Sequence, residues 1–493
     1  MLTKDDVKRV SDNIKRVYLE DQIPWIIGYS GGKDSTAVLQ IVWNTIKELS
    51  AEQRHKAVYI ITYDTLVESP IVAQWVKLSH QRIAKAAEKE ELPFEAKILT
   101  PSVKDTFWVN LIGKGYPYPR KNFRWCTERL KIKSGNTFVK DKISAYGEVI
   151  LVLGTRKAES ITRSKIIAEQ EQQEIRESLS TKSGMQNELT FSPIKDWTDD
   201  DVWQYLMQYK NAWGHSNEEL LAMYRGATAD NECPLVRSTD TPSCGKSRFG
   251  CWVCTLVERD KSMAAMIQND DEKAWMLPLL QFRDDFGDHE TDRSRREFCR
   301  MTGAIKLHND RLVHGPYKKE IREAWLCKLL EIELFIQKNG PEWFKDYRLI
   351  TDEELREIRR IWIEEKCEFD DMLPKIYKEV TGKELAVKKY ISAFSSNEYS
   401  ALSHICDKLY GKEELIFKMI SILLETERKE INGKFRAGIG KKLSSIIEAN
   451  FYKNEEDALS YARGFRNRKD VTLQEMLGVE IEDAVEGEDI DEN

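Results

Sequence analysis

The N-terminal half of the chain alternates short apolar runs with longer segments whose apolar positions recur every three or four residues. The runs have the length of buried strands, and the longer segments have the spacing of one helix face. The predicted strands cover residues 23–29, 57–63, 94–99 and 149–154. The predicted helices cover residues 1–20, 35–49, 70–90 and 127–145. This alternation predicts an α/β fold with a doubly wound parallel sheet, which binds ligands outside the carboxyl ends of its strands.

After residue 200 the strand pattern fades and a helical pattern takes over. The predicted helices cover residues 199–209, 218–224, 256–269, 317–338, 352–366, 371–381 and much of 386–470. Residues 226–254 lie between them and look like a cysteine-bearing loop. We therefore predict four regions along the chain. They are an α/β domain at 1–225, a cysteine-rich region at 226–300, a helical region at 301–477 and an acidic, disordered tail at 478–493.

The acidic tail accounts for the whole of the net charge of -7. It carries eight acids and no base, which leaves 76 basic and 75 acidic residues in the rest of the chain. A neutral body is not that of a strong autonomous DNA binder, because phosphate contacts dominate such affinity. No apolar run approaches the roughly 20 residues of a membrane helix, and the polar N-terminus lacks the apolar centre of a signal peptide. We expect a cytoplasmic protein that does not enter a membrane.

The most informative segment reads Trp-Ile-Ile-Gly-Tyr-Ser-Gly-Gly-Lys-Asp-Ser-Thr, at residues 25–36. A strand stops at Ser30 and a helix follows, so the backbone N–H groups of Ser30–Ser35 can converge on an anion at a helix N-terminus. Gly31 and Gly32 let the backbone approach a ligand closely, and Lys33 adds a full positive charge. The spacing differs from that of the common P-loop. The segment predicts a phosphate-binding loop.

Two further segments follow predicted strands and carry polar groups suited to a nucleotide. Asp64 can accept hydrogen bonds from ribose hydroxyls or an adenine amino group, although Ser69 and Pro70 also suit a simple helix start. Gly154 permits close approach of the backbone. Arg156 and Arg163 can grip phosphate oxygens in bidentate fashion. The alternative for the two arginines is a structural network through Glu159. Residues 192–205 look structural, with Thr198 as a helix N-cap.

Nine cysteines in a cytoplasmic chain argue against a disulfide framework. Four lie within 22 residues, namely Cys233, Cys244, Cys251 and Cys254. The pair Cys251-x-x-Cys254 places two thiolates on one turn, which suits zinc or an iron–sulfur cluster. With a single Cys-x-x-Cys pair the zinc-ribbon spacing is incomplete, but spacing alone does not separate zinc from an iron–sulfur cluster.

Cys126 is a separate candidate, as a further ligand or as a sulfur carrier. It lies between Arg124 and the pair Arg129 and Lys131, so we expect a lowered thiol pKa.

The motif Ser-Gly-Gly-Lys-Asp-Ser resembles the pyrophosphate loop of the N-type ATP pyrophosphatases. Five segments stand in the order seen in the phosphoadenylylsulfate (PAPS) reductase family: Ser30–Ser35, Asp64–Pro70, Arg124–Thr127, Gly154–Arg163 and Pro193–Tyr205. Three more are similar to the DndC family of DNA phosphorothioation sulfurtransferases: Ser243–Cys254, Gly315–Tyr317 and Glu320–Arg322.

The resemblance implies ATP with Mg²⁺ on the loop and a [4Fe–4S] cluster on Cys233, Cys244, Cys251 and Cys254. It implies that Ser30, Gly31, Gly32, Lys33, Asp34, Ser35, Asp64, Gly154, Arg156 and Arg163 bind the nucleotide, with Lys33, Asp34 and Cys126 in catalytic roles. The implied reaction adenylates a DNA backbone phosphate, releases pyrophosphate and then replaces AMP by sulfur. The implied partners are DNA within a multi-subunit complex, a cysteine desulfurase and an ATPase-type Dnd subunit.

Three alternatives remain at this stage. An adenylylsulfate or PAPS reductase would carry a redox cysteine near its C-terminus, whereas the last cysteine here is Cys406. A tRNA thiolase would use the same loop chemistry. An ATP-binding assembly subunit of a DNA-modification complex would bind the nucleotide without cleaving it.

Overall fold

The computed structural model describes residues 2–172, 174–181, 187–228, 249–301, 304–388, 395–410, 414–431, 438–450 and 454–464. These residues belong to two compact units. Unit 1 contains Met1–Asn110, Tyr118–Asp288 and Lys328–Glu354, and unit 2 contains Leu111–Pro117, His289–Cys327 and Leu355–Asn493. The finer division predicted from the sequence, with boundaries after residues 225, 300 and 477, stays a prediction. The acidic tail lies outside the described residues.

Unit 1 is built on a seven-stranded sheet in the order β3-β2-β1-β4-β7-β6-β5. Its strands are β1 (Trp25–Gly28), β2 (Val58–Tyr63), β3 (Phe94–Leu99), β4 (Val149–Val152), β5 (Glu174–Arg176), β6 (Leu179–Thr181) and β7 (Glu188–Phe191). The five strands from β3 to β7 in this order are parallel, and β6 and β5 are antiparallel additions at one edge. The α/β class and the mainly parallel sheet predicted from the sequence are confirmed.

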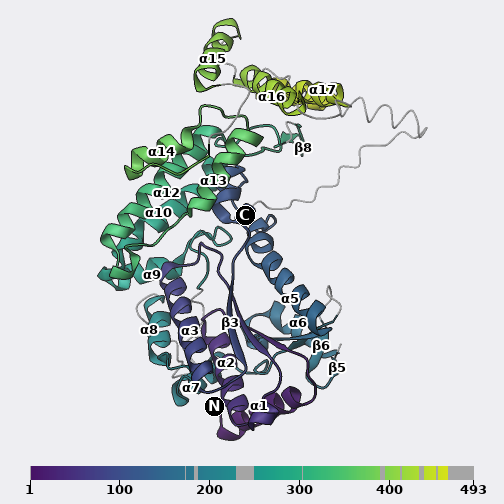
Figure 1. Ribbon diagram of the computed structural model, residues 1–493, viewed down its shortest axis with the longest axis vertical. Coiled ribbons are helices and arrows are strands. Elements are labelled where there is room, and N and C mark those ends of the chain that lie inside the picture. The colour runs from purple at the N-terminus through teal and green to yellow at the C-terminus, as the bar shows by residue number, and fades with distance from the viewer. Residues whose placement is uncertain are drawn as a thin grey trace, which may run out of the picture. The chain divides into compact units, whose positions relative to one another are not determined.

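Helices cover both faces of this sheet (Figure 1). The helices in the cores of the two faces are α1 (Lys4–Leu19), α2 (Lys33–Lys47), α3 (Pro70–Lys89), α5 (Lys133–Tyr146), α7 (Asp199–Gln208) and α8 (Asn217–Gly226). Unit 1 also contains α4 (Trp125–Thr127) and α6 (Ile161–Gln172). Successive residues of β1 point to opposite faces, as strand geometry requires. Trp25 and Ile27 join the core that includes α1, α2, α3 and α7, whereas Ile26 joins the core that includes α5.

The strand order reverses beside β1, because β2 and β3 lie on one side of it and β4 on the other. In such sheets the crevice between the two loops that leave in opposite directions is the usual ligand site. Here those loops follow Gly28 at the end of β1 and Val152 at the end of β4.

Local sequence signals explain where several helices begin. Thr3 caps α1 and Thr198 caps α7, each through a reciprocal capping box with an aspartate three residues later. Pro70 opens α3, where its missing N–H costs nothing. Ser69 occupies the N-cap position, but its side chain makes no capping hydrogen bond.

The segment from 125 to 146 is one helical run with a π-helical turn at Glu128–Ile132 between α4 and α5. Two further π-helical turns lie at Val109–Gly113 and Ile361–Glu365. Short 3-10 turns lie at Ala51–Gln53, Val103–Asp105, Lys157–Glu159, Asp271–Met276 and Glu342–Phe344.

The chain after α8 is largely helical, as predicted. The helices are α9 (Lys261–Asn269), α10 (Leu277–Phe286), α11 (His289–Asp292), α12 (Lys319–Asn339), α13 (Asp352–Arg360), α14 (Met372–Thr381), α15 (Ser396–Tyr410), α16 (Glu414–Ile431) and α17 (Ile439–Asn450). A short hairpin of β8 (Leu307–His308) and β9 (Arg311–Leu312) interrupts them.

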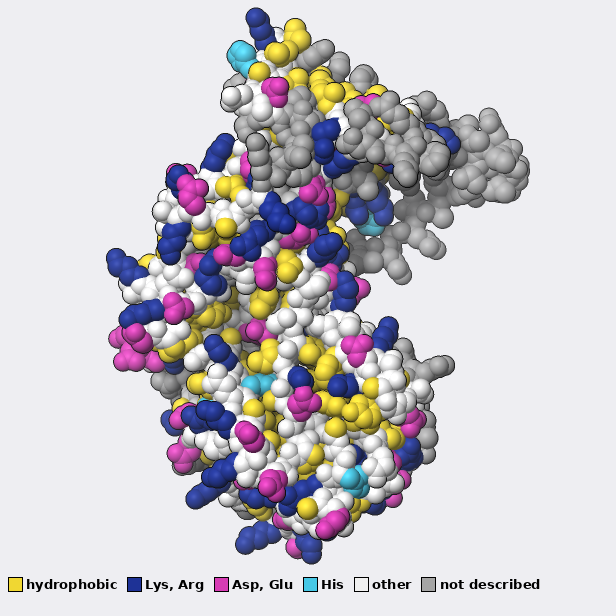
Figure 2. All heavy atoms as spheres, in the orientation of Figure 1, with side chains coloured by type: hydrophobic (Ala, Val, Ile, Leu, Met, Phe, Trp, Pro, Cys, Tyr) yellow, Lys and Arg dark blue, Asp and Glu magenta, His cyan; other side chains and the backbone are white. Residues whose placement is uncertain are grey.

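The surface agrees with the balanced charge of the body. Figure 2 shows basic and acidic side chains interspersed over the face that it presents. Across the described residues, no helix combines the length and the apolar character needed to cross a bilayer.

Candidate functional site: a phosphate-binding loop beside a cysteine knuckle

The loop between β1 and α2 is held in one conformation by its neighbours. Gly31 has φ +74°, and a Cβ there would lie 2.6 Å from Val76 Cγ2. The indole Nε1 of Trp75 donates to the Gly31 carbonyl oxygen at 3.1 Å. Only glycine fits this position without strain, because the backbone is left-handed and the side of the residue is already filled.

The two serines of the loop bond to each other across it. Their hydroxyl oxygens lie 3.1 Å apart, and the Ser30 N–H donates to Ser35 Oγ at 3.2 Å. Ser35 Oγ also donates to the Gly32 carbonyl oxygen at 3.0 Å. The turn is therefore closed before any ligand arrives, which reduces the ordering cost of binding.

Helix α2 begins at Lys33 without a side-chain cap from its own N-cap residue, Gly32. The Lys33 N–H instead donates to the hydroxyl of Tyr224, at 3.2 Å. Unbonded N–H groups and the helix dipole make such a terminus attractive to anions. Tyr224 satisfies one of these N–H groups from another helix, α8.

Four charged side chains form a network around the first turn of α2. Lys33 Nζ lies 3.3 Å from Asp199 Oδ1, and Arg156 Nε donates to Asp34 Oδ1 at 2.9 Å. Arg156 also bonds through Nη2 to Asp199 and through Nη1 to the Trp197 carbonyl oxygen, the latter at 3.1 Å. Because Arg156 is only 1% exposed, its guanidinium is fully committed to this network.

The two carboxylates of the network differ in their pKa. Burial raises the pKa of Asp34 above its ordinary value, and the nearby Arg156 and Lys33 only partly offset it. Burial acts in the same sense on Asp199, but the charges of Lys33 and Arg156 outweigh it and lower the pKa of that carboxyl. Asp199 is thus the firm anionic partner that holds Lys33 in place.

Gly154, two residues beyond β4, lies against the start of α2. A Cβ at this position would lie 3.0 Å from the Asp34 carbonyl carbon and oxygen. Glycine here lets the loop after β4 lie directly against the phosphate-binding loop. The structure therefore brings the two loops of the strand-order reversal together.

Two other predicted nucleotide residues lie apart from this network. Asp64 follows β2, where its Oδ1 accepts the Leu66 N–H at 2.8 Å and where burial raises its pKa. Arg163 is half-exposed and pairs with Glu159 at 3.7 Å, as the structural alternative described. The nucleotide-binding roles of both residues stay predictions.

The pair Cys251 and Cys254 forms a tight turn, in which the Cys254 N–H donates to the Cys251 carbonyl oxygen at 3.1 Å. This cysteine knuckle, residues 250–254, is fastened to the segment after β2. The Ser69 N–H donates to the Gly250 carbonyl oxygen at 3.1 Å, and the Trp252 N–H donates to the Val67 carbonyl oxygen at 3.0 Å. The knuckle thus adjoins the loop that carries Asp64.

The Cys251 thiol lies in a polar corner beneath this loop. Its sulfur lies 3.3 Å from Thr65 Oγ1 and 3.6 Å from Glu68 Oε1. Lys131 Nζ reaches the same Glu68 oxygen at 3.5 Å. Burial, and then the charge of Glu68, raise the pKa of Cys251.

The predicted low pKa of Cys126 is wrong. Burial raises the pKa of this thiol, and the nearby Cys254 adds to the shift. Basic residues beside Cys126 in the sequence do not offset the loss of water around the sulfur. Cys126 does lie within electrostatic reach of Cys254 and of Lys131.

The described residues supply two of the four predicted cluster ligands, Cys251 and Cys254. The other two, Cys233 and Cys244, lie outside the described residues. Within the described ranges, no three His, Cys, Asp or Glu side chains come together as a metal site. The two thiols on one turn fit one edge of a cluster or a zinc ion, and the ligand set stays a prediction.

Comparison with known proteins agrees with this geometry. Residues 24–213 match the phosphoadenosine phosphosulfate reductase domain family. The matched segment contains β1, the phosphate-binding loop, Gly154, Arg156 and Asp199, and it ends before Tyr224 and the cysteine knuckle.

Two curated relatives are uncharacterized proteins of Methanocaldococcus jannaschii. One is 27% identical over 179 residues, which are 36% of this chain and 34% of the relative. The other is 23% identical over 245 residues, which are 50% of this chain and 39% of the relative. The chain thus spans little more than a third of the length of these relatives.

Three solved structures share local likeness with the chain at low overall similarity. A PAPS reductase from Candida auris has a TM-score of 0.28 and 14% identity, over 45% of this chain and 92% of that one. An FMN adenylyltransferase from Candida glabrata has a TM-score of 0.26 and 11% identity, over 49% and 69%. The tRNA thiolase NcsA from Methanococcus maripaludis, with its [4Fe–4S] cluster, has a TM-score of 0.26 and 11% identity, over 58% and 81%. Likeness at this level does not bear on function.

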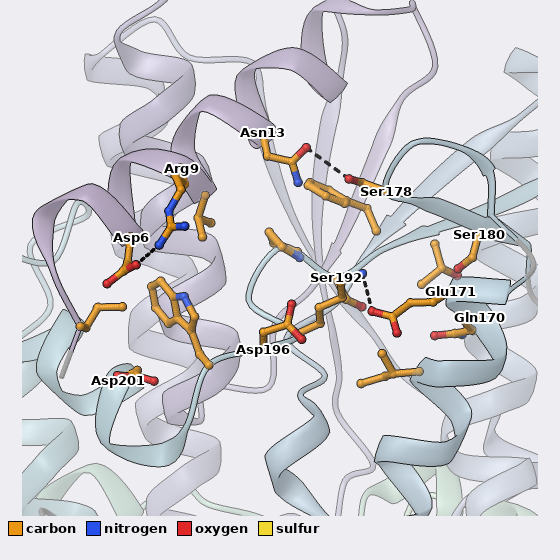
Figure 3. A pocket seen from close by; sticks show the side chains of 18 residues that line it. Asp6, Arg9, Asn13, Gln170, Glu171, Ser178, Ser180, Ser192, Asp196 and Asp201 are labelled. Carbon is orange, nitrogen blue, oxygen red and sulfur yellow. Dashed lines mark hydrogen bonds and ion pairs between the residues drawn. The ribbon is translucent and has the colours of Figure 1, made fainter.

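A cavity of about 550 Å³ lies in unit 1 between α1, α6 and the segment after β7 (Figure 3). Its lining residues, all of them described, do not include Ser30–Ser35. Its charged and polar side chains pair with one another, as Lys195 does with Glu171 at 2.7 Å and Asn13 with Ser178 at 3.3 Å. Loop geometry, and not cavity size, identifies the candidate site.

Sequence reasoning missed two residues of this site. Asp199 lies in a segment that looked purely structural, and its place at the first position of α7 was the available signal. Tyr224 lies on a different helix, and nothing in its local pattern links it to residue 33.

Proposed function

We propose that unit 1 cleaves ATP between its α- and β-phosphates and passes the AMP group to an acceptor oxygen, as the activating step of a sulfur transfer. The observation that carries this proposal is the pre-closed Ser30–Ser35 loop at the strand-order reversal, with Lys33 held beside it by Asp199. The match of residues 24–213 to the PAPS reductase domain family supports it.

In this proposal the loop N–H groups and Lys33 bind the β,γ-phosphates, with Mg²⁺ on the phosphate oxygens. The acceptor oxygen attacks the α-phosphorus, a new oxygen–phosphorus bond forms, and pyrophosphate leaves. Preorganised donors stabilise the charge that develops on the leaving group. Arg156 and Asp199 keep Lys33 in position throughout, because they are themselves fixed by buried hydrogen bonds.

For the acceptor we propose a non-bridging oxygen of a DNA backbone phosphate. The support is the sequence similarity of Ser243–Cys254, Gly315–Tyr317 and Glu320–Arg322 to the DNA phosphorothioation sulfurtransferases. The balanced charge of the body favours DNA presented by a multi-subunit complex over unaided binding. A cysteine desulfurase and an ATPase-type Dnd subunit are the proposed partners.

Cys251 and Cys254, together with Cys233 and Cys244, are the proposed holders of a [4Fe–4S] cluster. When bound, such a cluster supplies thiolate-ligated iron, with a reduction potential set by its surroundings. Cys126 is the proposed sulfur carrier. Anaerobic purification tests the assignment, because Cys251→Ser should lose iron and sulfide whereas Cys126→Ser should keep them. Stoichiometric zinc in the wild type would contradict it.

The test of the function is the identity of the products. With ATP labelled at the α-phosphorus, a cysteine desulfurase with cysteine as the sulfur source, and DNA or tRNA as separate acceptors, we expect AMP and pyrophosphate and the greatest release with DNA. Release dependent on tRNA would transfer the proposal to a tRNA thiolase. Release of sulfite from a sulfate nucleotide and a thiol reductant, without ATP, would transfer it to a reductase. ADP and orthophosphate would overturn it altogether.

A further inference from the structure

Tyr224 on α8 lies between the phosphate-binding loop and the cysteine knuckle. Its hydroxyl accepts the Lys33 N–H at 3.2 Å, and a Cβ on Gly32 would lie 3.1 Å from the same oxygen. The Lys33 Nζ lies 5.5 Å from the centre of its ring. Tyr224 therefore contacts the loop through the backbone N–H and the side chain of Lys33, which is expected to carry positive charge to the phosphates.

The same ring packs on the segment that leads into the knuckle. Tyr224 and Phe249 meet edge to face, with ring centres 4.6 Å apart and planes at 87°. Trp203, from α7, packs against Tyr224 edge to face at 5.1 Å. Edge-to-face contacts at this distance are favourable and orientation-specific. With only 8% of its surface exposed, Tyr224 has little room to move independently of these neighbours.

Phe249 is joined by one residue to the cysteines. Gly250 accepts the Ser69 N–H, and Cys251 forms a β-bridge with Glu68. A continuous set of contacts thus runs from Lys33 through Tyr224 and Phe249 to Cys251. Packed interiors transmit displacements because side chains have few alternative positions.

We propose that Tyr224 is a positioning residue that couples occupancy of the phosphate-binding loop to the conformation of the cysteine knuckle. Phosphates that draw Lys33 and its N–H toward themselves change the contact with Tyr224, and the ring carries this change to Phe249. The inference rests on the proposed function, because it takes a nucleotide as the ligand of the loop. In a sulfur transfer it would let the cysteines respond only when the nucleotide that activates the acceptor is bound.

Hydrogen exchange measures the coupling without requiring turnover. The purified full-length protein, with whatever metal it retains, is compared with and without saturating α,β-methylene ATP and Mg²⁺. The reporter amides in the knuckle are those of Trp252 and Cys254, which are hydrogen-bonded to Val67 and Cys251. We expect the nucleotide to change exchange in the 250–256 peptide by about fivefold or more, the lower range of typical coupling between sites.

The peptide that covers residues 30–36 reports binding in the same experiment. Protection there without any change at 250–256 would overturn the coupling and leave nucleotide binding intact. No protection at 30–36 would instead count against the proposed function. The two failures are therefore distinguishable.

Two variants test the two contacts of Tyr224 separately, one with Lys33 and one with Phe249. Tyr224→Phe removes the acceptor for the Lys33 N–H but keeps the ring, and Phe249→Leu removes the edge-to-face partner but keeps an apolar side chain. We expect both to bind the analogue, protecting residues 30–36, and both to lose the response at 250–256. A full response at 250–256 in either variant would overturn the proposal.

Tyr18→Phe is the matched control. Tyr18 is buried, and its hydroxyl donates to the Lys56 carbonyl oxygen at 3.2 Å, away from the loop. This variant also loses one buried hydroxyl, so it corrects for a general loss of stability. We expect it to keep the wild-type response, and loss of the response in this control as well would attribute the effect to stability and overturn the assignment of Tyr224.

Discussion

The two units each gather basic and acidic side chains in their interiors, but they hold them in different ways. In unit 1 the network of Lys33, Asp34, Arg156 and Asp199 borders a loop whose Ser30 is exposed. One arginine serves both carboxylates there, and the lysine is held at a distance of 3.3 Å from a single oxygen. The network leaves Lys33 able to exchange its partner for a phosphate.

In unit 2 the charged side chains pair with one another in the interior. Arg322 is 1% exposed and grips both oxygens of Glu368, with Nη1 at 3.3 Å from Oε2. Glu297 pairs with Lys418 at 2.5 Å. Lys366 lies among these four groups, and burial is the main cause that lowers its pKa to about 7.

The difference supports the proposed ligand site in unit 1. Buried ion pairs seldom add net stability over apolar residues, but removing one partner leaves a costly unpaired charge. In the cluster of unit 2, Arg322 pairs with Glu368 and Lys418 pairs with Glu297. Ion pairs matched one to one in this way stabilise a fold. The network in unit 1 has a shared arginine, an aspartate with raised pKa and an accessible loop, which is the arrangement of a binding site.

The largest expected effect comes from breaking the ion pair of Arg322 and Glu368 in unit 2. Arg322→Met leaves the carboxylate of Glu368 without its partner, so we expect a loss of about 3–5 kcal/mol in the free energy of unfolding of unit 2. Urea unfolding followed by circular dichroism measures it. The double variant Arg322→Met/Glu368→Leu, which removes both charges, should recover most of the loss. An unchanged urea midpoint in the single variant would show that this ion pair does not stabilise unit 2.

Next in size is the loss of Lys33. Lys33→Ala removes the positive charge at the loop, and we expect the release of AMP to fall by ~10²-fold, as when one preorganised donor is removed. Stability should change little, because Arg156 still neutralises Asp199. Lys47→Ala, on the last turn of the same helix, is the matched control. Equal activity of the two variants would place the chemistry elsewhere.

The sequence predicted some features of the fold and of the candidate site and missed others. The pattern predicted β3 at the residues where it lies and placed Ser30–Ser35 at a strand–helix junction, because both depend on local periodicity. It missed β5, β6 and β7, whose sequences are Glu-Ile-Arg, Leu-Ser-Thr and Glu-Leu-Thr-Phe. They lack the continuous apolar run that marks the equally short strands β1 and β4. It also missed Asp199 and Tyr224, and it gave Cys126 the wrong pKa shift. Those depend on burial and on contacts between distant segments, which no local window contains.

A smaller effect is expected where the two loops of the site touch. Gly154→Ala would place a Cβ 3.0 Å from backbone atoms of Asp34, which cannot move aside as a flexible side chain can. Overpacking of this kind raises the free energy of the packed site by about 1–3 kcal/mol. If roughly 1.4 kcal/mol of this appears in the activation free energy, kcat/KM for ATP falls about tenfold. In the control Gly226→Ala the new Cβ would meet only Lys273 Nζ, at 3.7 Å. Unchanged kcat/KM in Gly154→Ala would mean that the loops need not touch.

The smallest effect is a pH dependence in the cluster of unit 2. The pKa of Lys366 is about 7 in the folded protein against a usual 10.5, so between these values the unfolded chain binds a proton that the folded chain does not. The free energy of unfolding therefore rises with pH in this window, by roughly 1 kcal/mol from pH 7 to pH 8. The groups that face Lys366 are Arg322, Glu368, Glu297 and Lys418.

Lys366→Met should flatten this slope, because its side chain binds no proton in either state. The measurement is the urea midpoint at pH 7, 7.5 and 8 of the transition that Arg322→Met lowers. Lys408→Met, at an exposed position on α15, should keep the wild-type slope. If Lys366→Met also keeps it, the lysine is protonated in the folded state. Lys366 would then stay positively charged between pH 7 and pH 8. The contrast with Lys33, which can exchange its partner, would rest on the geometry of the ion pairs alone.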